Sequence, residues 1–116
     1  MTPSRNCAEY LGDILDAIEK AGRFARGMTL QQFENDEKTA FAVVRALGII
    51  GESMKRIPSD FRDRFPNVPW REMAAMGDNL IHDYSRVNLE VVWRTLSEDL
   101  PRLEQSIRRI VAGIGE

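Results

Sequence analysis

The clearest structural signal in the chain is the stretch 89–114, LEVVWRTLSEDLPRLEQSIRRIVAGI. Its apolar residues recur three or four positions apart, close to a heptad repeat: Leu89, Val92, Leu96, Leu100 (or Leu103), Ile107, Ile110 and Ile114. This spacing places them on one face of a helix. Pro101 lies inside the pattern and should bend the helix, because its ring removes one backbone hydrogen bond and crowds the preceding turn.

Three earlier segments show the same periodicity, with apolar stripes over 11–25, 40–57 and 70–84. Gly27 stops the first stripe and Pro58 ends the second, while Pro69 suits the first position of the third helix. That third stripe includes Leu80, Ile81 and Tyr84. Each segment is long enough to be a main helix of a small bundle.

The segments between these helices carry turn signals. Thr29-Leu30-Gln31-Gln32 has the form of a capping box and predicts a short helical turn. Residues 58–69 predict a connector with at most a short helix, held to the core by Phe61 and Phe65. Asn88 should begin the last helix. No segment alternates with period two, so the prediction is an all-α, up-and-down four-helix bundle with a short extra helix or connector, in one domain over 1–116.

Composition excludes several function classes. The 116 residues are 43% hydrophobic and 29% charged, as in an ordinary globular protein, and the net charge of -2 gives no general attraction to polyanions. One cysteine, Cys7, and one histidine make neither a disulfide nor a plausible zinc site, so we expect no metal and no cofactor. The chain lacks a secretory signal and any apolar run of about 18 residues, which predicts a cytoplasmic protein without a membrane segment.

Large apolar side chains could serve a partner as well as the core. Trp70, Met73, Met76 and Trp93 are candidates for either place. Four amphipathic helices with wide apolar faces often bury more surface than one small bundle can cover, so a homodimer is expected.

The reactive chemistry is concentrated in the string 77–84, Gly-Asp-Asn-Leu-Ile-His-Asp-Tyr, which holds the only histidine, His82. Histidine is the side chain best suited to proton transfer near neutral pH. On a helix, Asp78 and Asn79 precede His82 by four and three residues, so they share its face and Asp78 could orient the imidazole. Tyr84 would diverge from His82 unless the helix ends near Ser85. A solvated histidine without a catalytic role fits the same spacing.

Two motifs carry a resemblance to a known family. Residues 76–84 resemble the signature segment of the HepT-like family, a branch of the HEPN superfamily of small helical ribonuclease toxins. That signature is an arginine, a polar residue, three more residues, a histidine and, two positions on, a tyrosine. Residues 45–52, RALGIIGE, resemble the family's Arg-x-Leu-x-x-Ile-Gly-Glu segment. The resemblance covers nearly the whole chain.

The resemblance implies a HEPN-like bundle and a specific activity. Members are metal-independent endoribonuclease toxins that form homodimers in which two motifs line one cleft. The partner is a minimal nucleotidyltransferase antitoxin, which adds AMP to the motif tyrosine. Carried over by position, His82 would be the acid–base group acting on RNA, Asp78 the polar residue and Tyr84 the AMP acceptor. Four further residues are candidates for lining the cleft: Asn79, Arg45, Glu52 and Arg86.

The chain departs from the signature at one position, where Gly77 replaces the arginine. No cation is left there to stabilise the phosphate, a role whose loss costs orders of magnitude in rate. Gly77 has a possible structural reason, because glycine allows two helices to approach closely at a cost in helix propensity. The alternative function is therefore a non-catalytic helical dimer that binds a nucleotidyltransferase, and a plain helical interaction protein is a third.

Overall fold

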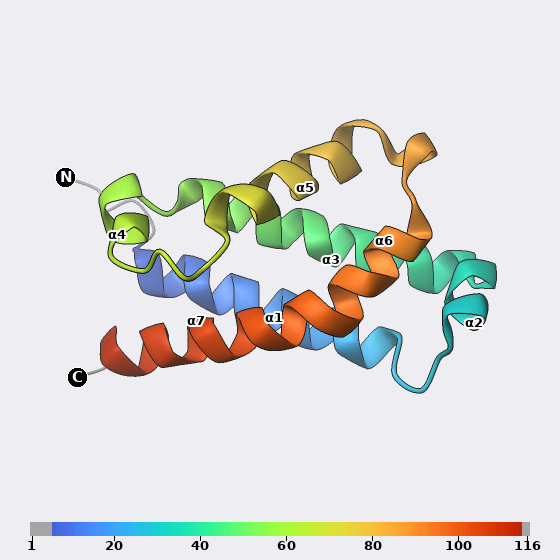
Figure 1. Ribbon diagram of the computed structural model, residues 1–116, viewed down its shortest axis with the longest axis horizontal. Coiled ribbons are helices and arrows are strands. Elements are labelled where there is room, and N and C mark those ends of the chain that lie inside the picture. Colours follow the sequence, from blue (N-terminus) through green and yellow to red (C-terminus); the bar gives the residue numbers. More distant parts are fainter. Residues whose placement is uncertain (1–5, 115–116) are drawn as a thin grey trace.

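The computed structural model describes residues 6–114, apart from the side chain of Ile114, the last residue of the predicted seam. No strand occurs within this range, and the all-α prediction is confirmed (Figure 1). The helices are α1 (Cys7–Phe24), α2 (Leu30–Asn35), α3 (Glu37–Arg56), α4 (Ser59–Asp63), α5 (Trp70–His82), α6 (Leu89–Arg94) and α7 (Leu100–Ile114). A 3₁₀ turn, Tyr84–Arg86, follows α5, and a π-helical turn, Thr95–Asp99, joins α6 to α7.

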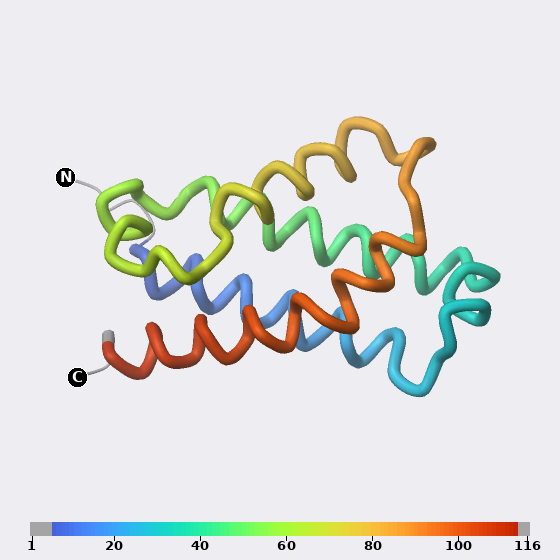
Figure 2. The backbone as a smooth tube through the Cα atoms, in the orientation of Figure 1, coloured from blue at the N-terminus to red at the C-terminus, as the bar shows by residue number. Residues whose placement is uncertain are grey.

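The long helices run alternately up and down. α3 packs antiparallel to α1 on one side and to α5 on the other, and α7 lies along α1 (Figure 1). The connector with α4 lies at one end of the bundle, and α2 and the passage from α5 to α6 lie at the other (Figure 2). The predicted up-and-down four-helix bundle is confirmed, with α6, the π-helical turn and α7 together forming the fourth helix.

Side-chain caps fix where several helices begin. The Thr29 hydroxyl accepts the Gln32 N–H and the Gln32 side chain accepts the Thr29 N–H, so the predicted capping box is present. Asp36 caps α3 by accepting the Thr39 N–H at 3.0 Å. Asn88 caps α6, as predicted. Each cap satisfies backbone donors that the first turn of a helix leaves without partners.

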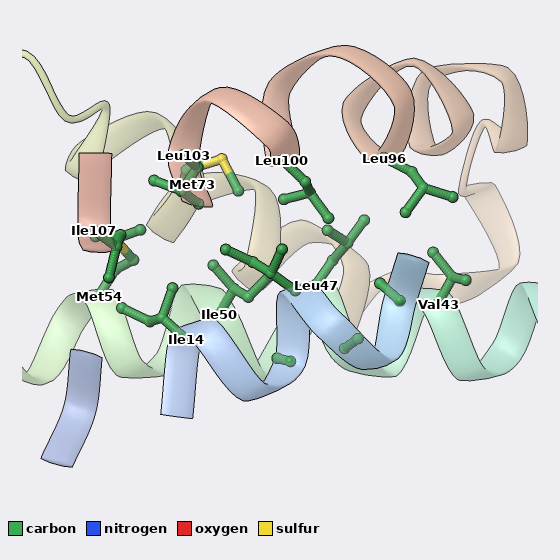
Figure 3. Packing of buried hydrophobic residues seen from close by; sticks show 14 of the residues in the cluster. Ile14, Val43, Leu47, Ile50, Met54, Met73, Leu96, Leu100, Leu103 and Ile107 are labelled. Carbon is green, nitrogen blue, oxygen red and sulfur yellow. The ribbon is translucent and has the colours of Figure 1, made fainter. Parts of the chain in front are cut away.

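The core is formed by the inward faces of the four long helices (Figure 3). The seam predicted in the last helix is buried from Val92 to Ile110, and both Leu100 and Leu103 belong to it. Trp70 and Met73 are also buried, so they belong to the core and not to a partner surface. Burying one such side chain contributes about 1.5–3 kcal/mol, so this seam is a main source of stability.

Pro101 perturbs the last helix just before its own position. Because proline lacks an N–H and its ring crowds the carbonyl four residues back, a regular α-helix cannot continue through it. The strain is taken up by the π-helical turn, in which the Leu100 N–H donates to the carbonyl of Thr95, five residues back. The helix axis changes direction there, and the predicted bend is confirmed (Figure 1).

The connector after α3 is short and anchored, as predicted. α4 has five residues, and the rings of Phe61 and Phe65 pack on each other with centroids 5.1 Å apart. The Trp70 indole N–H donates to the Phe65 carbonyl at 3.0 Å, which ties the connector to the start of α5. Pro69 lies one residue before the helix and not in its first position.

The prediction that Ile81 lies on the buried stripe of α5 is wrong. Leu80 is buried, but Ile81 is 44% exposed. Ile81 projects toward the flank of α3 at Gly48, which has no side chain to cover it.

Within residues 6–114, no helix combines the length and the apolar character that crossing a membrane requires.

Candidate functional site

The backbones of α3 and α5 touch where Gly51 crosses Gly77. A Cβ atom on Gly77 would lie 2.9 Å from the Gly51 Cα, and a Cβ on Gly51 would lie 2.8 Å from the Gly77 Cα. Both distances are shorter than a carbon–carbon contact allows, so each glycine is needed for this approach. The packing role that the sequence suggested for Gly77 is confirmed. Position 77 has no room for an arginine side chain at this helix separation.

His82 is the last residue of α5 and is exposed to solvent. The helix ends there because Asp83 leaves helical geometry, with φ -144° and ψ 53°. The break lets Tyr84 turn back onto α3, where its half-buried ring stacks on Phe41 with centroids 4.4 Å apart. Within residues 6–114, no hydrogen bond or ion pair engages the His82 imidazole. The site therefore presents an imidazole that is open to a ligand.

Asp78 does not pair with His82 as the sequence suggested. Its carboxylate accepts a hydrogen bond of 2.7 Å from the Lys55 ammonium of α3, and Glu52 lies 3.3 Å from the same nitrogen. The hydrogen bonds to Asp78 and then to Glu52 raise the pKa of Lys55 above its usual value. Asp78 is drawn to the cation on the neighbouring helix, which its position on the α3 side of α5 brings within reach. Glu52, one of the candidates for lining a cleft, is half exposed at the edge of this pair.

A depression of about 260 Å³ lies between α3 and the end of α5, and we call it the α3–α5 groove. It is lined by Phe41, Val44, Arg45, Gly48, Leu80, Ile81 and Tyr84. Arg45 is exposed, and none of the described carboxylates lies within ion-pair distance of its guanidinium. The groove thus combines a stacked aromatic pair with an unpaired cation. Sequence reasoning found Arg45 and Tyr84 but missed Phe41, whose signal was an aromatic residue off the buried stripe.

Asn79 of α5 and Arg86 of the following 3₁₀ turn lie apart from the α3–α5 groove. They line a second depression of about 270 Å³ that faces α6. Arg86 makes a loose ion pair with Asp83 at 3.8 Å, and its side chain is 85% exposed. Within one chain, Arg45 and Arg86 therefore lie in different depressions. In sequence, His82 lies between residues that line the two depressions.

In the described part of the chain, no three His, Cys, Asp or Glu side chains gather as a metal site.

Comparison with known proteins assigns the family. The family model described as "Ribonuclease HepT-like" matches residues 14–110. The chain is 47% identical over 106 residues to "Probable ribonuclease HepT" of Thermococcus cleftensis, covering 91% of this chain and 96% of that protein. It is 36% identical over 112 residues to "Putative RNase MJ1216" of Methanocaldococcus jannaschii, covering 97% of this chain and 93% of that protein. The comparison with solved structures found no significant match. The predicted resemblance is confirmed, and the chain belongs to the ribonuclease HepT-like family.

Proposed function

We propose that the protein is a metal-independent endoribonuclease, the toxin of a toxin–antitoxin pair, acting in the cytoplasm. The observation that carries the proposal is the exposed, unengaged imidazole of His82 at the broken end of α5, within the region that the family model matches. The names of the relatives, which describe ribonucleases, support the same reaction class.

The proposed reaction uses the ribose 2′-hydroxyl of RNA as the nucleophile. His82 accepts the 2′-hydroxyl proton, the 2′-oxygen attacks the adjacent phosphorus, and the bond to the 5′-oxygen breaks. That oxygen leaves with a proton supplied by an acid, so the products carry a 2′,3′-cyclic phosphate and a 5′-hydroxyl.

This step needs a base and an acid, and each chain has one histidine. We propose that a homodimer brings two His82 side chains to one cleft, where one acts as base and the other as acid. The family resemblance supports this arrangement.

Tyr84 is the proposed site of neutralisation. A minimal nucleotidyltransferase antitoxin would transfer AMP to its phenol oxygen, which releases pyrophosphate from ATP and forms a phosphodiester. The Tyr84 ring lines the α3–α5 groove beside the unpaired Arg45, so a bulky anionic adduct would fill the groove. Coexpression with the adjacent nucleotidyltransferase should add the mass of one AMP unit, and Tyr84→Phe should prevent it.

The contact between Gly51 and Gly77 favours one alternative. Position 77 holds glycine and not the motif arginine, and its close contact with Gly51 leaves no space for an arginine unless α5 moves. A non-catalytic dimer that binds the nucleotidyltransferase, with Tyr84 as acceptor, would tolerate this loss.

Cleavage of mixed cellular RNA in excess EDTA separates the two functions. The parent protein should cleave RNA, and His82→Ala should lose about 100-fold or more in rate because a general acid–base group is removed. Ser85→Ala, a change at another exposed position three residues on, is the matched control and should cleave normally. Sedimentation of each protein reports the proposed dimer. Absence of cleavage by the folded parent would contradict the ribonuclease proposal and favour the non-catalytic one.

A further inference from the structure

We infer that the α3–α5 groove binds one nucleotide of single-stranded RNA, with the base stacked on Phe41 and a phosphate held by Arg45. The inference rests on the proposed function for the identity of the ligand. It assigns a substrate subsite whose lining residues Ile81 and Tyr84 flank His82 in sequence, and it gives Arg45 the role of the cation that is absent at position 77.

Phe41 is exposed in a way that core packing does not explain. Its side chain is 51% exposed, while the neighbouring Ala40 and Val43 of α3 are buried. Tyr84 covers part of the Phe41 ring at a centroid distance of 4.4 Å and an interplanar angle of 27°. The remaining exposed ring surface extends this stack and offers a platform for a further flat group. Bases of single-stranded RNA bind such platforms, and each stack strengthens binding about 5- to 150-fold.

Arg45 supplies the charge that a nucleotide needs. It lies four residues after Phe41, one turn further along the same helix face. The other basic side chains of the candidate site already have carboxylate partners. Lys55 pairs with Asp78 and Glu52, and Arg86 pairs more loosely with Asp83. A guanidinium without a carboxylate partner keeps all its donors for a phosphate, which it can bind through two parallel hydrogen bonds.

The size and lining of the groove suit a single nucleotide. Its volume of about 260 Å³ lies just below the range typical of drug-sized ligands. Gly48 keeps it open, since a Cβ there would lie 3.3 Å from the Ile81 side chain. The walls from Val44, Leu80 and Ile81 are apolar and carry no donors or acceptors for base edges, so the subsite should accept any base.

The groove is adjacent to the proposed acid–base group in the chain. Ile81 and Tyr84, which line it, flank His82 in sequence at the end of α5. A nucleotide stacked there would extend its neighbouring phosphodiester along this end of the helix. Arg45 would then be a binding and positioning residue for the strand that His82 cleaves.

The test uses an RNA that cannot be cleaved. A fluorescein-labelled uridine decamer with 2′-O-methyl groups has no free nucleophile, so fluorescence anisotropy measures binding alone. Phe41→Leu should weaken binding by at least 5-fold, and Phe41→Trp should retain it, because only an aromatic ring can stack. Arg45→Gln should weaken binding and reduce the slope of log affinity against log salt by about 0.7, the value for one phosphate on a single strand.

Arg23 and Phe24 of α1 provide the matched control. Phe24 is 41% exposed, and the Arg23 guanidinium lies 5.2 Å from its ring, but this pair borders no described groove and Arg23 is bound to Glu19. Phe24→Leu and Arg23→Gln should bind the decamer like the parent protein. Urea denaturation of every variant verifies that it is folded.

Two results would overturn the inference. One is normal binding by both Phe41→Leu and Arg45→Gln. The other is a loss of binding that follows dissociation of the dimer in sedimentation, because the groove would then be an interface between copies. The proposed function is tested separately. If the parent protein binds the decamer but does not cleave ordinary RNA, the inferred subsite stands and the proposed ribonuclease activity is contradicted.

Discussion

Replacing Gly77 by alanine should destabilise the protein, although alanine is the better helix former. In an open helix position, exchanging glycine for alanine contributes up to about 1 kcal/mol of stability. At position 77 the added Cβ would lie 2.9 Å from the Gly51 Cα, about 0.5 Å inside the 3.4 Å at which ordinary contact begins. The obstacle is backbone, which cannot rotate away, so α5 must move off α3. Overpacking of this kind costs about 1–3 kcal/mol.

Gly12→Ala in α1 is the matched control, because a Cβ there meets nothing within 4 Å. It should raise the free energy of unfolding by about 0.5–1 kcal/mol through helix propensity alone. The difference between the two variants isolates the helix crossing and should be about 1–3 kcal/mol in urea denaturation. Equal stabilisation by Gly77→Ala and Gly12→Ala would refute the crossing argument.

Restoring the motif arginine should also destabilise the protein. Gly77→Arg should be less stable than Gly77→Ala and should not gain RNA cleavage, because the longer side chain forces α5 further from α3 and disturbs the groove next to it. A Gly77→Arg protein as stable as the parent and faster in cleavage would show that the two helices separate freely.

Three further predictions concern caps and charges. The hydrogen bonds from Thr39 lower the pKa of Asp36 below 3.8, so its contribution to stability is present above pH 3.8 and is lost as the pH falls further. When the urea denaturation midpoint is plotted against pH, Asp36→Asn should flatten the curve below pH 3.8. Asp78→Asn should lower the pKa of Lys55 toward 10.5 in an NMR titration, and the stability from this pair should be lost only above that pH. Asn88→Ala should cost about 1 kcal/mol in urea denaturation, while Asn88→Asp should retain the cap.

Local sequence rules were sufficient for most of the fold. The capping box at Thr29, the helix end before Pro58 and the bend at Pro101 depend on neighbouring residues only, and the structure contains all three features. The apolar periodicity likewise identified the buried faces, because helix geometry relates sequence spacing directly to direction. Ile81 is an exception: it is 44% exposed and lies against Gly48 of another helix, a contact that spacing within one helix does not reveal.

The candidate site could be predicted less completely because it depends on how two helices are aligned. Spacing placed Asp78 on the face of His82, but it could not show that Lys55, 23 residues away in the chain, would lie 2.7 Å from Asp78. Phe41 was missed for the same reason: its meaning comes from stacking on Tyr84 of a different segment.

The loss of the motif arginine and the α3–α5 groove have a common structural origin. Gly77 and Gly51 set how closely α5 approaches α3, and Ile81, one turn beyond Gly77, therefore lies against Gly48 in the wall of the groove. An arginine at position 77 would bring a cation but would push these walls apart. With glycine there, the cation for the proposed cleavage would have to come from a position that the crossing does not occupy, and Arg45 of α3 meets that condition. The packing of two glycines thus links the departure from the family signature to the surface on which we expect RNA to bind.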